Sequence, residues 1–128
     1  MNKLTIDEAL KTAHTHKARH AELAEDARKV WATAKEELRK LEAKTLLMIK
    51  AQDPEIKVGE LKALVDNDKD VYNKRLELVC LESDYKKEEI QVEKWDDLYM
   101  SAKRLAQLRI EEMRGLGDGV RKETVDGG

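Results

Sequence analysis

The fold is decided by residues 71–113, VYNKRLELVCLESDYKKEEIQVEKWDDLYMSAKRLAQLRIEEM, which place an apolar side chain at every seventh position. These positions are Val71, Leu78, Tyr85, Val92, Tyr99, Ala106 and Met113. A strict seven-residue repeat returns to the same face of an α-helix every two turns. The repeat therefore predicts one long helix whose apolar seam packs along a second helix.

The first half of the chain carries a seam of its own, in which apolar or small residues recur at steps of three and four. These residues are Ile6, Leu10, Ala13, Ala24, Ala27, Trp31, Ala34, Leu38, Leu41, Thr45 and Met48. The only proline, Pro54, lies between the two seams, and a proline drives the residue before it out of the helical conformation. The sequence thus predicts an all-α fold, a long antiparallel two-helix hairpin with a short connecting helical segment.

Local signals set the bounds of the first two elements. Thr5 and Glu8 have the spacing of a capping box, so the first helix is expected over about residues 5–52. The connection spans residues 53–67 and is expected to contain a short helical segment. Its apolar residues are Leu61, Leu64 and Val65.

The second long helix is expected over about residues 68–114. Three glycines follow, and glycine is the residue that most favours a left-handed helix end. These are Gly115, Gly117 and Gly119. Residues 1–117 then form a single helical-hairpin domain, and residues 118–128 a disordered tail.

Composition agrees with helices that have solvated outer faces. The chain has 128 residues, which is enough for one domain. Charged residues make up 41% of it and aromatic residues only 4%, with no Phe. Because the apolar residues are periodic rather than sparse, disorder is not expected.

The formal net charge of −2 hides an uneven distribution. Residues 1–52 carry 11 Lys or Arg against 8 Asp or Glu, a net charge of +3. Residues 53–100 carry 8 against 14, a net charge of −6. The chain is therefore not a generally basic nucleic-acid binder, and any site for a polyanion must be a local patch.

One cysteine, Cys80, excludes an intrachain disulfide and suits a reducing cytosol. We expect its side chain to be buried or half-buried, since it lies two residues after the seam position Leu78. No apolar run typical of a signal peptide or of a membrane span is present in the sequence.

Apolar residues beside the two seams widen the hydrophobic surface beyond what a two-helix pair covers. They are Leu23, Val30, Leu46, Leu76, Val79, Leu98 and Leu105. An isolated hairpin would leave this outer stripe in water, so we expect the chain to form a homo-oligomer, a bundle or a ring.

Nothing in the sequence indicates catalysis or a cofactor. Neither a glycine-rich phosphate loop nor a Ser/His/Asp or Cys/His arrangement is present, so an enzyme is not expected. His14, His16 and His20 lie close together, but they lack an HExxH pattern and a nearby cysteine. We interpret them as a solvated or seam-edge cluster rather than a metal site.

The aromatic residues fit the seams, so we interpret them as core rather than as base-stacking groups. The positions assigned to the core or to an oligomer seam are Trp31, Leu38, Leu41, Val71, Leu78, Tyr85, Val92, Trp95 and Tyr99.

Basic residues line the second half of the first helix and continue through the connection. They are Arg28, Lys29, Lys35, Arg39, Lys40, Lys44, Lys50, Lys57 and Lys62. Lys29, Lys40 and Lys44 fall on one flank, at separations of eleven and four residues. Two interpretations are open, a solvated face of intrahelical ion pairs and a phosphate-binding patch. In an oligomer, each copy would repeat the patch, and weak contacts would add along a polyanion.

The layout resembles the UvsY-like family of phage recombination mediators. The resemblance covers most of the chain in order and in length, with its best local stretches at residues 63–71, at Lys50-Ala51 and at residues 113–115. A Leu-Lys-Ala-Arg motif ends the first helix in that family and is implicated in DNA and protein contacts. The corresponding run here is Ile49-Lys50-Ala51-Gln52, so the second positive charge of the motif is missing.

The resemblance implies a non-catalytic, ring-like homo-oligomer that binds single-stranded DNA. Such a protein helps to load a RecA-like recombinase onto strands coated by single-strand-binding protein, in the cytoplasm of an infected bacterial host. The candidate DNA-binding residues are Arg39, Lys40, Lys44, Lys50, Lys57 and Lys62. The alternative is a structural or assembly coiled-coil protein, a scaffold or adaptor without a nucleic-acid role.

Overall fold

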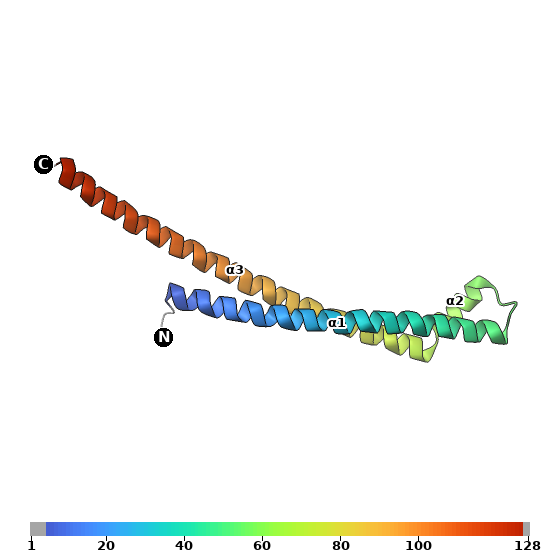
Figure 1. The fold of residues 1–128 in the computed structure, drawn as a ribbon. Helices are drawn as coiled ribbons and strands as arrows, with labels where there is room; N and C mark the ends of the chain where they lie inside the picture. The colour runs from blue at the N-terminus through green and yellow to red at the C-terminus, as the bar shows by residue number, and fades with distance from the viewer. Residues whose placement is uncertain (1–4, 127–128) are drawn as a thin grey trace. The chain divides into compact units, whose positions relative to one another are not determined.

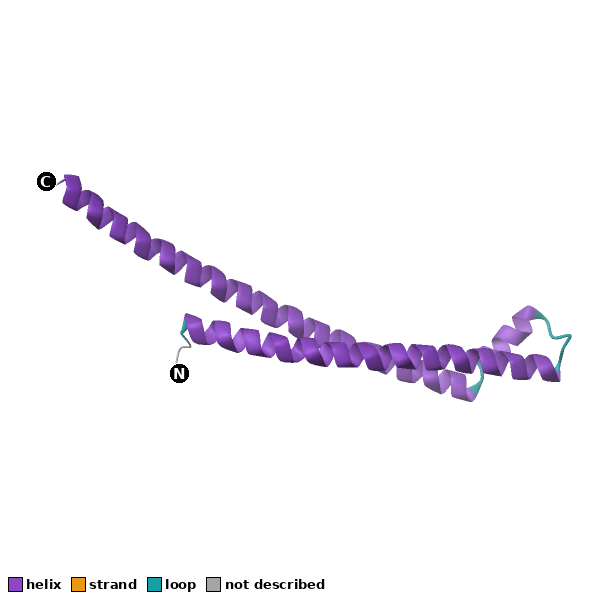
Figure 2. Cartoon of the chain, viewed as in Figure 1, coloured by secondary structure: helices purple, strands orange, loops and turns teal. Residues whose placement is uncertain are grey.

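The computed structural model describes residues 5–126, and for residues 117–126 it describes the backbone only. Three helices follow one another in the chain: α1 (Ile6–Gln52), α2 (Val58–Asp66) and α3 (Lys69–Asp126) (Figures 1 and 2). No strand occurs in the described part of the chain. The all-helical prediction is confirmed, as are the two long helices and the short helical segment between them.

Helix α1 begins with the predicted capping box. The Thr5 hydroxyl oxygen accepts the backbone N–H of Glu8 at 3.1 Å, and the Glu8 carboxylate accepts the backbone N–H of Thr5 at 3.1 Å. Two amides that the first turn leaves without helical partners are thereby satisfied. The helix ends at Gln52, just before the Asp53-Pro54 pair, as predicted.

The predicted helical segment of the connection is α2, and its apolar face is folded inward. Leu61 and Val65 are both buried. The Asn67 backbone N–H closes the helix on the carbonyl of Ala63 at 3.0 Å. The next residue, Asp68, caps α3 with its side chain, which accepts the backbone N–H groups of Asp70 and Val71 at 3.0 Å each.

The chain divides into two compact units that share both long helices. One unit comprises Met1–His20 and Gln91–Gly128, and the other comprises Ala21–Ile90, which includes α2. The single helical-hairpin domain over residues 1–117 stays a prediction. Two antiparallel helices contact each other only along a stripe, so each segment of one helix packs on the adjacent segment of the other and no single central core forms.

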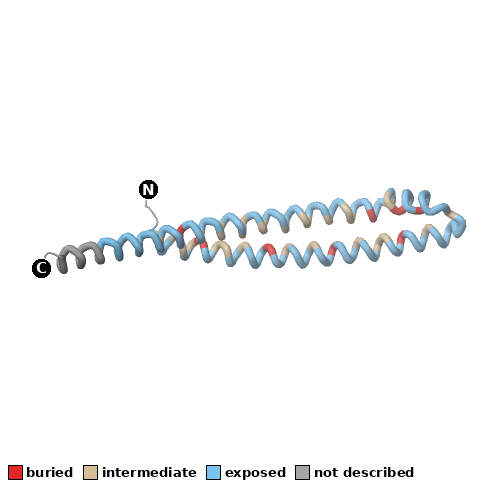
Figure 3. Tube along the Cα trace, turned by 90° about the horizontal axis from the view of Figure 1, so that it is seen from above, coloured by how far each residue is buried: buried red, intermediate tan, exposed pale blue. Residues whose placement is uncertain are grey.

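Few residues along the two long helices are buried, and most of the trace is coloured as intermediate or exposed (Figure 3). The buried residues of the described part are Ala13, Ala24, Ala34, Thr45, Leu61, Val65, Val71 and Ala102. Most are small, so they let the helix backbones approach without forming a thick core. Val71 is the largest side chain that is fully buried.

The predicted seam positions are recovered with two exceptions. Half-buried side chains are found at Trp31, Leu38, Leu41, Leu78, Tyr85, Val92, Trp95 and Tyr99. Met48 is 56% exposed, and the half-buried Ile49 takes its place in the seam. Met113 is 68% exposed.

The outer stripe is exposed, as the sequence predicted. All of its members are exposed in the single chain: Leu23, Val30, Leu46, Leu76, Val79, Leu98 and Leu105. The expectation for Cys80 is wrong, because its side chain is exposed. A residue two positions beyond the seam is turned by about 200° around a helix, which takes Cys80 away from the partner helix.

The predicted end of the second long helix at Arg114 is wrong. Helix α3 continues through the three glycines to Asp126, and residues 127–128 of the predicted disordered tail lie outside the described residues. No glycine of the described chain has a positive φ, so none adopts the left-handed conformation that ends a helix. A glycine inside a helix costs only about 1 kcal/mol relative to alanine, which helical neighbours can offset.

Replacing Gly115 by Ala should therefore stabilise this end of α3. A Cβ atom added at Gly115 meets no atom within 4 Å, so the substitution removes only the entropic cost of glycine. We expect a gain of about 0.5–1 kcal/mol in local stability. Slower amide hydrogen exchange around residue 115 is the readout, and unchanged exchange would argue against a helix there.

Candidate nucleic-acid interface

A groove of about 410 Å³ lies where α1, α2 and α3 meet in the Ala21–Ile90 unit. Half of its lining residues are apolar: Ala43, Leu46, Val58, Leu61 and Val65. Its charged lining is Arg39, Glu42, Lys62, Asp66 and Arg75. The groove thus brings together two of the six candidate DNA-binding residues, Arg39 from α1 and Lys62 from α2.

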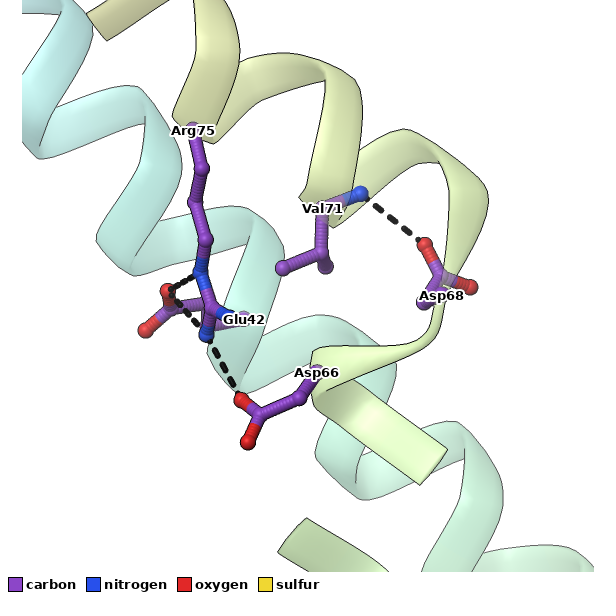
Figure 4. A network of polar contacts seen from close by, with 5 residues as sticks. All are labelled: Glu42, Asp66, Asp68, Val71 and Arg75. Atoms are coloured by element: carbon purple, nitrogen blue, oxygen red, sulfur yellow. Dashed lines mark hydrogen bonds and ion pairs between the residues drawn. The ribbon is translucent and has the colours of Figure 1, made fainter. Parts of the chain in front are cut away.

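Arg75 joins the three helices at this groove (Figure 4). Its guanidinium donates to the Glu42 carboxylate from Nε at 3.2 Å and from Nη2 at 3.0 Å. Nη2 also donates to Asp66 at 2.9 Å. The hydrogen bond to Asp66, followed by that to Glu42, raises the pKa of Arg75 above its usual value. Arg75 therefore ties the end of α2 to both long helices.

Sequence reasoning missed this role of Arg75. Its partners lie 33 and 9 residues away, on two other helices. No helical spacing links such distant positions, and only the fold of the connection brings them together.

The six candidate DNA-binding residues differ in whether their side chains form an ion pair within the chain. Arg39 is bound to Glu36 at 2.8 Å. The other five make no ion pair within the described residues: Lys40, Lys44, Lys50, Lys57 and Lys62. Lys57 directly precedes α2, and its side chain does not cap that helix.

The candidates do not converge on one point. Lys40 and Lys44 lie about 100–140° around α1 from Arg39, at 100° per residue. They therefore face a different direction from the groove that Arg39 lines. Lys50 and Lys57 flank the end of α1. The arrangement suits a polyanion that runs along a helix better than a small ligand held in a pocket.

Most of the aromatic side chains pack between the two long helices. Trp31 stacks on Tyr85, with ring centroids 5.6 Å apart, and Trp95 stacks on His16 at 4.3 Å. Both indole N–H groups are buried without an acceptor. Tyr72, which is exposed, does not by itself form a ladder on which successive bases stack.

Two histidines of the cluster, His14 and His16, also contact aromatic rings of α3. In addition to the His16–Trp95 stack, the rings of His14 and Tyr99 lie 6.0 Å apart. No group of three or more His, Cys, Asp or Glu side chains within residues 5–116 is placed to hold a metal ion.

Comparisons with protein families, with curated proteins and with solved structures find no match to this chain. Among the described helices, none is long and apolar enough to cross a membrane.

Proposed function

We propose that the chain is a non-catalytic protein that binds single-stranded DNA and acts as a recombination mediator. The observation that carries the proposal is a set of lysines with no ion-pair partner in the described chain. They lie in the second half of α1 and in the connection: Lys40, Lys44, Lys50, Lys57 and Lys62. A lysine without a carboxylate partner is free to neutralise a phosphate and release its counterion.

The remaining parts of the proposal come from the resemblance to UvsY-like mediators. The chain would form a ring-like homo-oligomer and load a RecA-like recombinase onto strands coated by single-strand-binding protein. It would act in the cytoplasm of an infected bacterial host. The exposed outer stripe supports self-association, because hydrophobic surface of this kind marks protein interfaces.

Charge reversal at the end of α1 should abolish DNA binding. Lys50→Glu combined with Lys57→Glu replaces two free positive charges by negative ones in every copy. Because exposed lysines carry the contacts, helicity and particle size should stay unchanged. Fluorescence anisotropy with a labelled oligothymidylate at about 50 mM salt is the measurement.

The matched control reverses two exposed lysines of the acidic half, Lys87→Glu with Lys94→Glu. Both double variants change the net charge of the chain by the same amount. We expect the control to keep most of its affinity. Equal losses in the two variants would contradict a local site at the end of α1.

A structural or assembly role is the second candidate function. The exposed apolar residues of α3 favour it, since they call for a protein partner whether or not DNA is bound. Under this alternative, the protein assembles but shows no affinity for single-stranded DNA. The same binding experiment therefore separates the two functions.

A further inference from the structure

The positively charged side chains of the second half of α1 fall into two groups, which differ in whether they have partners within the chain. One group is held within the chain. Arg28 donates to both Glu25 carboxylate oxygens, at 2.7 and 3.0 Å, and Arg39 donates to Glu36 at 2.8 Å. Lys35 places its ammonium 3.5 Å from the centroid of the Trp31 ring, a cation–π contact.

The other group is Lys29, Lys40 and Lys44, which make no hydrogen bond or ion pair within the described residues. Lys29 has only a Coulomb attraction to Glu25. That carboxylate is already engaged by Arg28, whose hydrogen bond is the main cause of its lowered pKa.

The two acidic residues between Lys29 and Lys40 are engaged elsewhere. Glu36 binds Arg39 on the same helix. Glu37 binds Lys74 of α3, and this hydrogen bond is the first cause of the raised pKa of Lys74. Neither carboxylate is therefore free to neutralise the three unpaired lysines.

Helical geometry places the two groups on separate stripes. Arg28, Lys35 and Arg39 stand at i, i+7 and i+11 and share one face. Lys29, Lys40 and Lys44 stand at i, i+11 and i+15 and share another face, about 100–160° around the helix from Arg28. The second stripe spans about 22 Å at 1.5 Å per residue. This length is several times the spacing of successive phosphates along a strand, so each of the three lysines can contact a different phosphate.

We propose that Lys29, Lys40 and Lys44 form the track along which α1 holds the phosphate backbone of a single strand. This inference rests on the proposed function and refines its site. It adds Lys29 to the candidates and removes Arg39, whose charge serves the helix itself. Lys50 lies beyond the track toward the connection and extends the positive surface to Lys57.

Two triple variants of the full chain test the track. The first removes it, with Lys29, Lys40 and Lys44 all replaced by Gln. The second replaces Arg28, Lys35 and Arg39 by Gln and serves as the control. Both lose three positive charges, and glutamine is a good helix former, so α1 should persist in each.

The track variant should bind an oligothymidylate roughly 500-fold more weakly at about 50 mM salt, which is the loss that three phosphate contacts imply relative to about 1 M salt. Its plot of log affinity against log salt should also lose about 2 units of slope, at roughly 0.7 per lost phosphate contact. The control should lose no more than a few-fold and keep the slope of the wild type. Circular dichroism should show equal helicity in all three proteins.

Two results would overturn the track. Equal losses in both triple variants would mean that net charge alone governs binding, and an unaffected track variant would place the contacts elsewhere. In both cases the wild type still binds DNA, so the proposed function survives. A wild type without affinity for DNA would overturn both proposals. An acidic protein that binds the wild type but not the track variant would then identify the stripe as a protein-binding surface.

Discussion

Replacing Val71 by Asp should unfold the Ala21–Ile90 unit or weaken it by about 3–5 kcal/mol in free energy of unfolding. Val71 is fully buried at the start of α3. A carboxylate there would lie in the seam without a partner. Figure 4 also places it beside Glu42, Asp66 and Asp68, so the new negative charge would meet three others. The only cation of that network, Arg75, is already bound to two carboxylates.

Chemical denaturation followed by circular dichroism is the measurement for Val71→Asp. Ala32→Asp is the control, because Ala32 is exposed on α1 and its replacement should cost only about 0.5–0.7 kcal/mol in helix propensity. Leu78→Asp should fall between the two, since Leu78 is half-buried. Equal stability of Val71→Asp and Ala32→Asp would mean that the seam is assigned to the wrong face.

The second large effect concerns assembly. Light scattering at micromolar concentration should show a particle several times heavier than the 14.7 kDa chain. Tyr72, Leu76 and Val79 are exposed and stand at i, i+4 and i+7 on α3. Ile90, eighteen residues after Tyr72, returns to the same face after five turns. Burial of this stripe against a second copy of the chain removes apolar surface from water and therefore favours association.

Leu76→Asp combined with Val79→Asp should break the assembly into smaller particles without loss of helicity. Both side chains point away from the seam, so the helix pair itself should persist. A control with Ala32→Asp and Ala63→Asp adds the same charge at exposed alanines and should keep the size of the wild type. A wild-type protein that runs as a monomer with a full helical spectrum would refute self-association.

Helix type and most helix bounds follow from the sequence because they depend on local signals. The seven-residue repeat identified the seam from Val71 through Tyr99, and the Thr5–Glu8 box marked the start of α1. Pro54 marked its end. The end of α3 could not be predicted in the same way. Glycine favours a helix end only where the backbone turns left-handed, and Gly115 does not.

The candidate site could be predicted only in part. Sequence spacing placed Lys29, Lys40 and Lys44 on one flank of a helix. It could not show that Glu37 is taken by Lys74 across the helix pair or that Lys35 lies over Trp31. Whether a charged side chain has a partner depends on which helices meet and in which register. That information lies in the tertiary fold, and it separates structural cations from free ones.

The most direct test of the central claim is a salt titration of wild-type binding to an unstructured single strand. We expect measurable affinity at about 50 mM salt and a linear fall of log affinity with log salt. The slope should correspond to about 0.7 for each phosphate contact, and base identity should matter little. No binding at about 50 mM salt would contradict the account and favour the structural alternative.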